Sequence, residues 1–125
     1  MQSDQNPADT LFGVGLPTSQ PYQETLQLAI DAEVSGFKQV WIGDHYQSRN
    51  PFLLLAVIAG GTNKIQLCTG ITNPFHVPPA VLASTAITLD ELAGGRVLLG
   101  LGVGDAITLR QIGTYPSKPV STMRH

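Results

Sequence analysis

Residues 65–105 read IQLCTGITNPFHVPPAVLASTAITLDELAGGRVLLGLGVGD. Residues 65–72 and the almost continuously apolar run at residues 97–102 have the length of buried strands. Between them, residues 79–92 carry apolar side chains at helical spacing, and a pair of glycines ends that pattern. A helix between two buried strands is typical of a βαβ unit, whose strands are parallel. This stretch therefore predicts a parallel sheet covered by helices.

The same alternation extends toward the N-terminus. Short apolar runs at residues 11–16 and 39–42 predict two further strands. Apolar residues at helical spacing predict a helix over residues 21–34, and its stripe is formed by Leu26, Ala29, Ile30 and Val34. They also predict a helix over residues 51–59 that two glycines break. The fold class is therefore α/β, and with right-handed crossovers either a doubly wound sheet or a barrel satisfies the pattern.

Both ends of the sequence depart from this alternation. Residues 1–10 are polar and contain no apolar run, so we expect a flexible leader there. Residues 106–118 show no regular period, because a glycine and a proline interrupt them, and a new helix is expected to start at Ser121. We therefore expect residues 11–125 to form a partial domain that is cut at the start of its fourth helix.

The composition restricts the class of protein. The chain has 125 residues, 42% of them apolar, and its 13% of charged residues is well below the ~25% of an average soluble domain. A net charge of −2 gives no electrostatic case for binding nucleic acid or an anionic membrane. There is no secretory signal and no apolar run of the ~18 residues that a spanning helix needs, so the expected location is the cytoplasm. Three histidines and one cysteine exclude a dense metal or disulfide framework, and Cys68 is expected to be a small buried side chain.

Polar residues follow three of the four predicted strands. They are Asp44 and His45, then Thr72 and Asn73, and finally Asp105. In a parallel α/β fold, the carboxyl ends of the strands form the binding face, so these side chains are candidates for a ligand site. Each of the two aspartates also suits a purely structural role, because an Asp side chain readily caps a turn or a helix.

Two other features favour structural roles. Gly100, Gly102 and Gly104 resemble part of a phosphate-binding pattern, but Ile107 stands where the last glycine of that pattern would be. Close packing is therefore the expected role of these glycines. His76 lies on a loop between two prolines and is expected to be solvated.

Four segments resemble motifs of the bacterial-luciferase-like superfamily, and they occur in that family's order. They are residues 41–46 (WIGDHY), 69–75 (TGITNPF), 88–96 (TLDELAGGR) and 99–105 (LGLGVGD). Together they are most similar to the branch that depends on coenzyme F420 and includes methylenetetrahydromethanopterin reductase. The resemblance extends from about Leu11 to the last residue.

The resemblance implies a (β/α)8 TIM barrel of more than twice this length. This chain would then be the N-terminal half of the barrel, with about four parallel strands and three complete helices. The resemblance also implies an oxidoreductase that transfers a hydride between the deazaflavin coenzyme F420 and a small-molecule substrate, such as a methylenetetrahydromethanopterin-type pterin. In such enzymes the cofactor supplies the ring chemistry, while the protein positions the ring and excludes water.

The resemblance further implies which residues contact the coenzyme. They are Asp44, His45, Gly70, Ile71, Thr72, Asn73 and Asp105. Among them Asp44 is the expected catalytic residue, close to the ring. Gly70–Ile71 matches a position where the family often has a non-proline cis peptide bond in a bulge behind the ring. No metal site is implied.

Two positions depart from the reductases of this branch. Gly15 stands where they commonly carry a glutamate that supports pterin chemistry, and residues 77–79 replace an Arg-His-Pro sequence, which removes a cation from the rim. Two alternative functions stay open, an FMN-dependent luciferase-like monooxygenase and a non-catalytic half-barrel. An open half-barrel exposes both edges of its sheet, so we expect self-association or a homo-oligomer.

Overall fold

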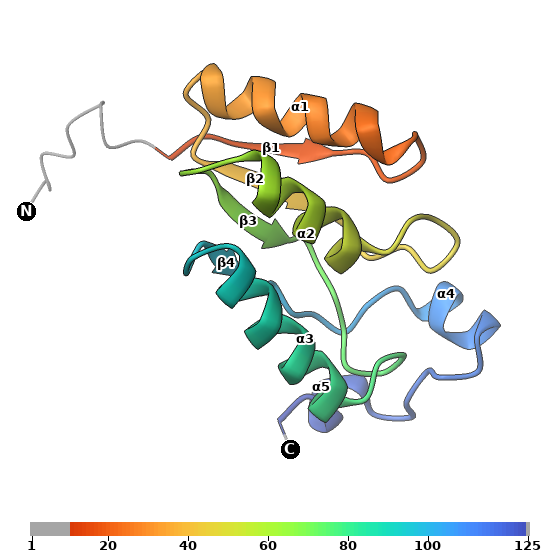
Figure 1. The fold of residues 1–125 in the computed structure, drawn as a ribbon. Coiled ribbons are helices and arrows are strands. Elements are labelled where there is room, and N and C mark those ends of the chain that lie inside the picture. The colour runs from red at the N-terminus through yellow and green to blue at the C-terminus, as the bar shows by residue number, and fades with distance from the viewer. Residues whose placement is uncertain (1–10, 125) are drawn as a thin grey trace, which may run out of the picture.

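The computed structural model of this protein describes residues 11–124 (Figure 1). Its elements are β1 (Gly13–Leu16), α1 (Tyr22–Val34), β2 (Gln39–Ile42), α2 (Pro51–Gly61), β3 (Gln66–Thr69), α3 (Pro79–Leu92), β4 (Val97–Leu98), α4 (Ala106–Gln111) and α5 (Pro119–Thr122). The strands and helices alternate as predicted as far as β4. The leader expected over residues 1–10 lies outside the described residues.

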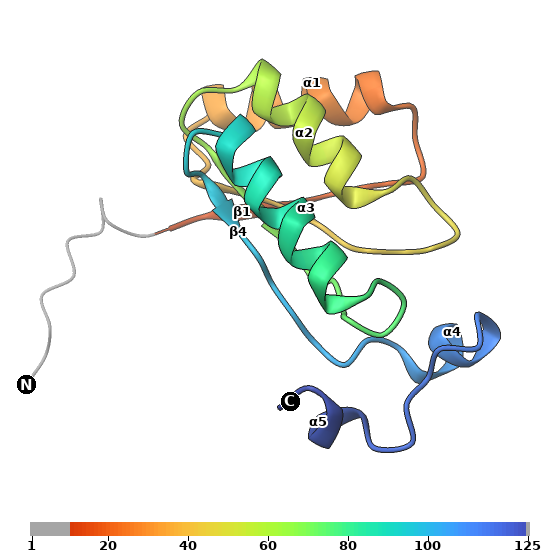
Figure 2. The same cartoon turned by 60° about the horizontal axis from the view of Figure 1, so that its bottom comes forward.

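The four strands form one parallel sheet in the order β1-β2-β3-β4. Val40 in β2 has Val14 of β1 and Leu67 of β3 as its register partners. The helices α1, α2 and α3 lie side by side on one face of this sheet (Figure 2). A doubly wound sheet carries helices on both faces, whereas a barrel carries them all on its outside. The structure therefore has the barrel arrangement, one of the two that the sequence pattern allowed.

The hydrophobic core lies between the sheet and these helices. Val40, Ile42 and Leu67 from the strands are fully buried, and they belong to one cluster with Leu55 and Ile58 of α2. Full burial of side chains of this size contributes about 1.5–3 kcal/mol each. The helix α2 is apolar on nearly all sides because it packs between α1 and α3 as well as on the sheet.

The helix α2 continues through Gly60 and Gly61, where the sequence predicted a break. The hydroxyl group of Thr62 donates a hydrogen bond to the carbonyl of Ile58 at 2.7 Å, which holds the last turn. A β-carbon on Gly61 would lie 2.7 Å from Cδ1 of Leu26. The glycine at this position therefore permits close packing against α1, and it does not end the helix.

The buried stripe of α1 differs in part from the prediction. Val34 is 83% exposed, and the buried positions are Thr25, Ala29 and Ala32. Of the predicted stripe, Ala29 is fully buried and Leu26 packs against the core. The small side chains at the buried positions allow the helix to lie close to its neighbours. The hydroxyl group of Thr25 donates to the carbonyl of Pro17 at 3.2 Å, so this buried polar group is satisfied.

The segment 106–118, predicted to be irregular, begins with the helix α4. Asp105 is its N-cap, because its Oδ2 accepts a hydrogen bond from the backbone N–H of Thr108 at 2.8 Å. The helix α5 begins at Pro119 and not at Ser121. A helix as short as α4 has too few side chains to show a helical period, which is why the sequence pattern missed it.

The strands β3 and β4 are shorter than the apolar runs that predicted them. They end at Thr69 and Leu98, whereas the predicted strands reached residues 72 and 102. Beyond these ends, Thr72 and Leu101 still form an isolated parallel bridge. The two segments therefore pair again beyond an interruption that lies next to the candidate site, with the register shifted by one residue.

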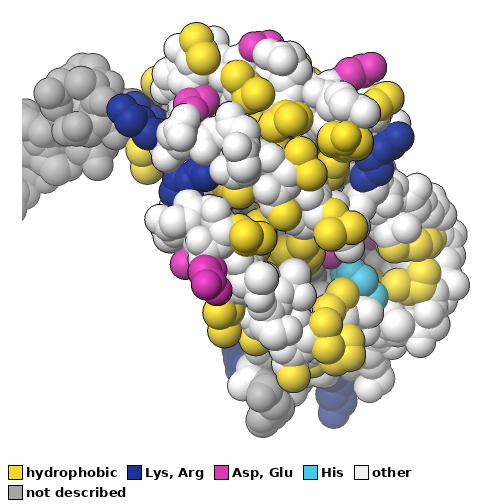
Figure 3. Space-filling model, viewed as in Figure 1, with side chains coloured by type: hydrophobic (Ala, Val, Ile, Leu, Met, Phe, Trp, Pro, Cys, Tyr) yellow, Lys and Arg dark blue, Asp and Glu magenta, His cyan; other side chains and the backbone are white. Residues whose placement is uncertain are grey.

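Exposed hydrophobic side chains lie on the outside of the helical layer (Figure 3). Among them are Leu53 of α2 and Ile87 and Leu92 of α3, which are 71%, 68% and 63% exposed. Within residues 11–124, no helix combines the length and the apolar character needed to cross a bilayer.

Candidate functional site

The segments that leave β2, β3 and β4 meet around a cavity of about 220 Å³ at the carboxyl ends of the strands. The sequence-predicted residues that line it are Asp44, His45, Gly70, Ile71, Asn73 and Asp105. Thr72, the remaining predicted residue, is buried and does not line the cavity. Its hydroxyl group donates a hydrogen bond to Asp44, which does line it. The parallel topology brings these residues together because all four strands end at the same edge of the sheet.

Asp44 is held in place by groups from the next strand along the chain. Its side chain is only 7% exposed, and its Oδ2 accepts a hydrogen bond from the hydroxyl group of Thr72 at 2.7 Å. Nε2 of His76 lies 3.1 Å from the same oxygen. The backbone N–H of Asp44 donates to the carbonyl of Ile71 at 3.1 Å. Within residues 11–124 both side-chain contacts use Oδ2, so Oδ1 is available to accept a hydrogen bond from a ligand.

His76 belongs to this site, and the prediction that it is solvated was wrong. Its side chain is 17% exposed, and its Nδ1 lies 3.0 Å from Oδ1 of Asn73. The backbone N–H of Phe75 donates to the same Asn73 oxygen at 3.1 Å, which identifies that oxygen as the acceptor. His76 therefore connects Asn73 to Asp44. The sequence contained one indication of this contact. Asn73 is a residue type that favours turns, and a turn there folds the following residues back toward Asn73.

The peptide bond between Gly70 and Ile71 is cis, as the resemblance implied. The backbone N–H of Gly70 donates to the carbonyl of Ile42 at 2.8 Å. A β-carbon on Gly70 would lie 3.0 Å from Cε3 of Trp41, so this position has little room for a side chain. The side chain of Ile71 is 43% exposed and gives the cavity an apolar surface.

The glycines after β4 serve close packing, as predicted. A β-carbon on Gly100 would overlap the carbonyl oxygen of Thr69, and one on Gly102 would overlap Cδ1 of Ile71. The carbonyl of Gly100 accepts a hydrogen bond from the backbone N–H of Thr72 at 2.9 Å. These contacts hold the β4 segment against residues 69–72, which lie next to the candidate site.

Asp105 lines the cavity, but its carboxylate is also the cap of α4. Hydrogen bonds from the hydroxyl group and the backbone of Thr108 lower the pKa of Asp105 from its ordinary value of 3.8. The capping role, which the sequence left as an alternative, is therefore confirmed for this residue.

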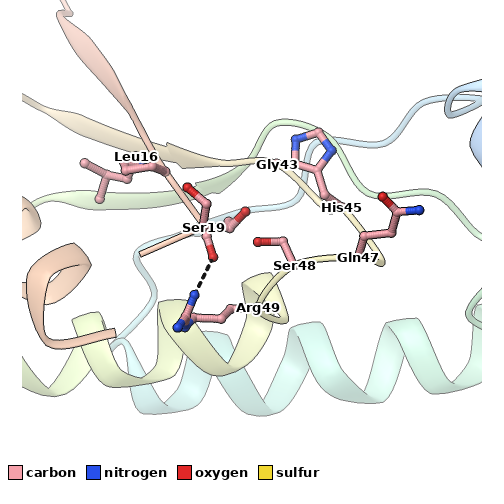
Figure 4. A pocket seen from close by; sticks show the side chains of 9 residues that line it. Leu16, Ser19, Gly43, His45, Gln47, Ser48 and Arg49 are labelled. Atoms are coloured by element: carbon pink, nitrogen blue, oxygen red, sulfur yellow. Dashed lines mark hydrogen bonds between the residues drawn. The ribbon is translucent and has the colours of Figure 1, made fainter. Parts of the chain in front are cut away.

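A larger cavity of about 740 Å³ lies between the segments that leave β1 and β2 (Figure 4). Gly43 and His45 line both cavities, so the two adjoin. In Figure 4, Arg49 reaches from the start of α2 toward the β1 segment, where its Nη1 donates to the carbonyl of Thr18 at 3.2 Å. Among the residues that line this cavity, the sequence predicted only His45 as a ligand-binding residue.

Cys68 is buried in β3, and burial raises the pKa of its thiol to about 11. A thiol with so high a pKa is a poor nucleophile near neutral pH. Within residues 11–124, no group of three or more His, Cys, Asp or Glu side chains is placed to hold a metal ion.

Comparison with known proteins places this geometry in a family. Residues 8–124 match the sequence profile described as luciferase-like monooxygenase. Over 113 residues the chain is 42% identical to the 5,10-methylenetetrahydromethanopterin reductase of Archaeoglobus fulgidus, in an alignment that covers 90% of this chain and 34% of that protein. The chain thus spans about a third of the length of the curated relatives it matches.

Solved structures of the same kind share the fold. The coenzyme F420-dependent tetrahydromethanopterin reductase from Methanopyrus kandleri superposes with a TM-score of 0.79 at 38% identity, over 82% of this chain and 30% of that one. An F420-dependent secondary alcohol dehydrogenase in complex with an F420-acetone adduct superposes with a TM-score of 0.74 at 31% identity, over 89% of this chain and 38% of that one. The fold class, part of a luciferase-like TIM barrel, is confirmed. The chain belongs to the luciferase-like monooxygenase family.

Proposed function

We propose that this chain forms one wall of the coenzyme site in an F420-dependent oxidoreductase, in which a hydride passes between the deazaflavin and a small-molecule substrate. The observation that carries the proposal is the hydrogen-bonded group of Asp44, Thr72, His76 and Asn73 around the smaller cavity. Relatives that are named as F420-dependent enzymes support the choice of coenzyme.

The groups around the smaller cavity fit a flat ring that has a polar edge. Oδ1 of Asp44 can accept a hydrogen bond from a ring N–H, and the amide group of Asn73 can donate one to a ring carbonyl. The exposed side of Ile71 offers an apolar surface to the ring face. When bound, the coenzyme supplies the hydride chemistry, and the chain supplies binding and orientation.

The proposed roles follow from how each residue is held. Asp44 is the proposed catalytic residue, and Thr72 and His76 fix its carboxylate before a ligand arrives. A polar group that is already oriented needs little reorganisation when charge develops on the ligand. His45 and Asp105 complete the rim of the coenzyme site in this proposal.

A methylenetetrahydromethanopterin-type pterin is the proposed substrate that relatives support most directly. Gly15 bears on this choice, because the glutamate expected for pterin chemistry is absent there. A β-carbon on Gly15 would meet no atom within 4 Å, so the position has room for a larger side chain. A Gly15→Glu variant therefore tests whether this position governs the use of a pterin.

The proposal is tested by titrating the full-length gene product with oxidised and reduced coenzyme F420 and measuring the heat of binding by calorimetry. We expect binding at tens of micromolar or tighter, and about tenfold weaker binding for Asp44→Asn, since a hydrogen bond to a charged group is lost. Asp31→Asn, an exposed change on α1, is the matched control and should bind as the unmodified protein does. No binding at these concentrations would overturn the proposal, and purification of a yellow protein with flavin absorbance would favour the FMN-dependent alternative.

A further inference from the structure

We propose that the larger cavity, named here the Arg49 cavity, binds an anionic group of the substrate, a carboxylate or a phosphate. The residues that line it are Leu16, Pro17, Thr18, Ser19, Gly43, His45, Gln47, Ser48 and Arg49. The inference rests on the proposed function only where it identifies the ligand as the substrate. The preference for an anion is argued from the residues of the cavity.

The charge of the cavity is the first argument. Arg49 contributes a guanidinium group, and none of the lining residues is an aspartate or a glutamate. Within residues 11–124, the structure pairs Arg49 with no carboxylate. A guanidinium group has five N–H donors, and here one bond to the Thr18 carbonyl at 3.2 Å is formed. The other donors are suited to a carboxylate or a phosphate, which a guanidinium group binds through two parallel hydrogen bonds.

An unsatisfied hydroxyl group is the second argument. Oγ of Ser48 is buried and has no hydrogen-bond partner within residues 11–124. Buried polar atoms nearly always have a partner, so one that lacks it indicates a missing ligand or water. Ser48 lies next to Arg49 in the chain and lines the same cavity, and both point toward the β1 segment in Figure 4. Because Oγ of Ser48 is closed to solvent in this conformation, a ligand oxygen bound to Arg49 would accept its hydroxyl group once the side chain turns toward the cavity.

The position of Arg49 is the third argument. It precedes Asn50, the N-cap of α2, whose Oδ1 already accepts the backbone N–H groups of Phe52 and Leu53 at 2.9 and 3.2 Å. A cation at the N-terminus of a helix is disfavoured by the helix dipole, whereas an anion is favoured. The dipole of α2 therefore does not stabilise the charge of Arg49. An anion bound there would be stabilised both by the guanidinium group and by the helix dipole.

The location of the cavity explains why the ligand is the substrate. Gly43 and His45 line the Arg49 cavity and the smaller cavity alike. A molecule anchored at Arg49 would therefore extend past His45 toward the proposed ring site at Asp44. The acidic tail of the coenzyme is the other anion that could occupy the Arg49 cavity. The experiment below distinguishes it from an anionic group of the substrate.

The test measures anion binding to the full-length gene product by calorimetry, with inorganic phosphate and acetate as probes and glycerol as the neutral comparison. We expect at least one anion to bind, and Arg49→Gln to weaken it about tenfold or more, as expected for loss of a charge-assisted hydrogen bond. Arg110→Gln is the matched control, because it removes one positive charge from the same end of the sheet, where Arg110 lies over the ring of Tyr115. Ser48→Ala, a small change that should leave the fold intact, is expected to weaken binding about threefold.

Simultaneous binding identifies the source of the anion. If the site belongs to the substrate, saturation with coenzyme F420 leaves phosphate or acetate binding in place, whereas displacement of the probe would assign the cavity to the coenzyme tail and overturn the proposal. Equal binding by the unmodified protein and the Arg49→Gln variant, or no anion binding at millimolar concentration, would also overturn it. Because the probes need no coenzyme, anion binding without F420 binding would reject the proposed function and leave the anion site standing.

Discussion

At the scale of single residues, the position of His76 fixes the orientation of the Asp44 carboxylate. The imidazole ring bridges Oδ1 of Asn73 and Oδ2 of Asp44, at 3.0 and 3.1 Å. With Thr72 on the same carboxylate oxygen, the Asp44 side chain has little freedom to rotate. In the proposed coenzyme site His76 is therefore a positioning residue, since it would act on the coenzyme through Asp44.

Replacing His76 should weaken coenzyme binding through Asp44 alone. We expect His76→Phe to raise the dissociation constant of coenzyme F420 about tenfold, because the Asp44 carboxylate loses one partner. His76→Gln keeps an N–H donor and should recover most of the affinity. The double variant His76→Phe/Asp44→Asn should bind no more weakly than Asp44→Asn does. Fully additive losses in this cycle would show that His76 acts independently of Asp44.

Two glycines, Gly15 in β1 and Gly100 just after β4, should respond differently to the same small change. At Gly100 an added methyl group meets the carbonyl oxygen of Thr69, which is backbone and cannot rotate away, whereas at Gly15 it meets nothing within 4 Å. We expect Gly100→Ala to lower the free energy of unfolding by about 1–3 kcal/mol, as overpacking does. Gly15→Ala should change it by roughly 0.5 kcal/mol or less. Urea denaturation measures both, and equal effects would contradict the packing role of Gly100.

At the scale of the elements, Glu33 joins the end of α1 to the segment between α2 and β3. Its carboxylate accepts the backbone N–H groups of Asn63, Lys64 and Ile65 at distances between 2.7 and 3.1 Å. Burial raises the pKa of Glu33, but these three hydrogen bonds and the nearby charge of Arg96 outweigh it, so its pKa lies below the ordinary value of 4.5. This contact lies at the amino ends of the strands, where side chains in barrels serve stability.

The sign of the Glu33 contribution follows from its lowered pKa. The folded state prefers the ionised carboxylate, so the stabilisation is present above pH 4.5 and is lost as the pH falls through the lower pKa of the folded state. We expect Glu33→Gln to cost about 1 kcal/mol at neutral pH, a value reduced because the carboxylate is partly exposed. The cost should shrink in acid, as thermal unfolding at pH 7 and pH 3 can show. The exposed Glu91→Gln is the control, and a cost for Glu33→Gln that does not depend on pH would contradict this account.

Arg96 connects three elements at the same end of the sheet. Its guanidinium group donates to the carbonyl oxygens of Ala59, Thr62 and Ile65 at 3.0–3.2 Å. The helix α2 has no basic residue in its last turn, and Arg96 supplies the positive charge that its carboxyl end favours. This contact gives a physical reason why α2 continues through its two glycines.

At the scale of the whole molecule, the sheet of the described chain has two unpaired edges. β1 pairs only with β2, and β4 pairs only with β3. On the segments near the open side, Ile71, Leu98 and Leu101 are 43%, 40% and 48% exposed. Exposed strand edges and apolar surface of this kind promote pairing with another chain.

The 125-residue chain is therefore expected to self-associate. Light scattering coupled to size-exclusion chromatography should give a mass above the 13.3 kDa of one chain. The double variant Leu98→Ser/Leu101→Ser should shift the population toward the monomer, because it removes exposed apolar surface. Val120→Ser, an exposed change on α5, is the control. A stable monomer of the unmodified chain would contradict this picture of an open sheet.

Local patterns determined most of the fold. The strand β2 and the helix α3 have the bounds that the sequence predicted, because apolar spacing and the flanking prolines and glycines act within a few residues of each other. The sequence also predicted that Asp44, Asn73 and Asp105 lie at one end of the sheet, since parallel strands end at a common edge. The cis bond at Gly70–Ile71 came from the family resemblance, and no pattern of spacing indicated it.

Contacts between residues far apart in the sequence decided the remaining features of the fold and the site. No local sequence pattern contains such contacts. The helices cover one face of the sheet, which selected the barrel arrangement over the doubly wound one. The bridge between His76 and Asp44 and the place of Arg49 beside Thr18 depend on how loops from different strands approach each other. The sequence by itself therefore determined most of the elements and the edge of the sheet at which the candidate site lies. Only the tertiary structure decided which side chains touch there, because hydrogen bonds and packing depend on distance in space and not on separation along the chain.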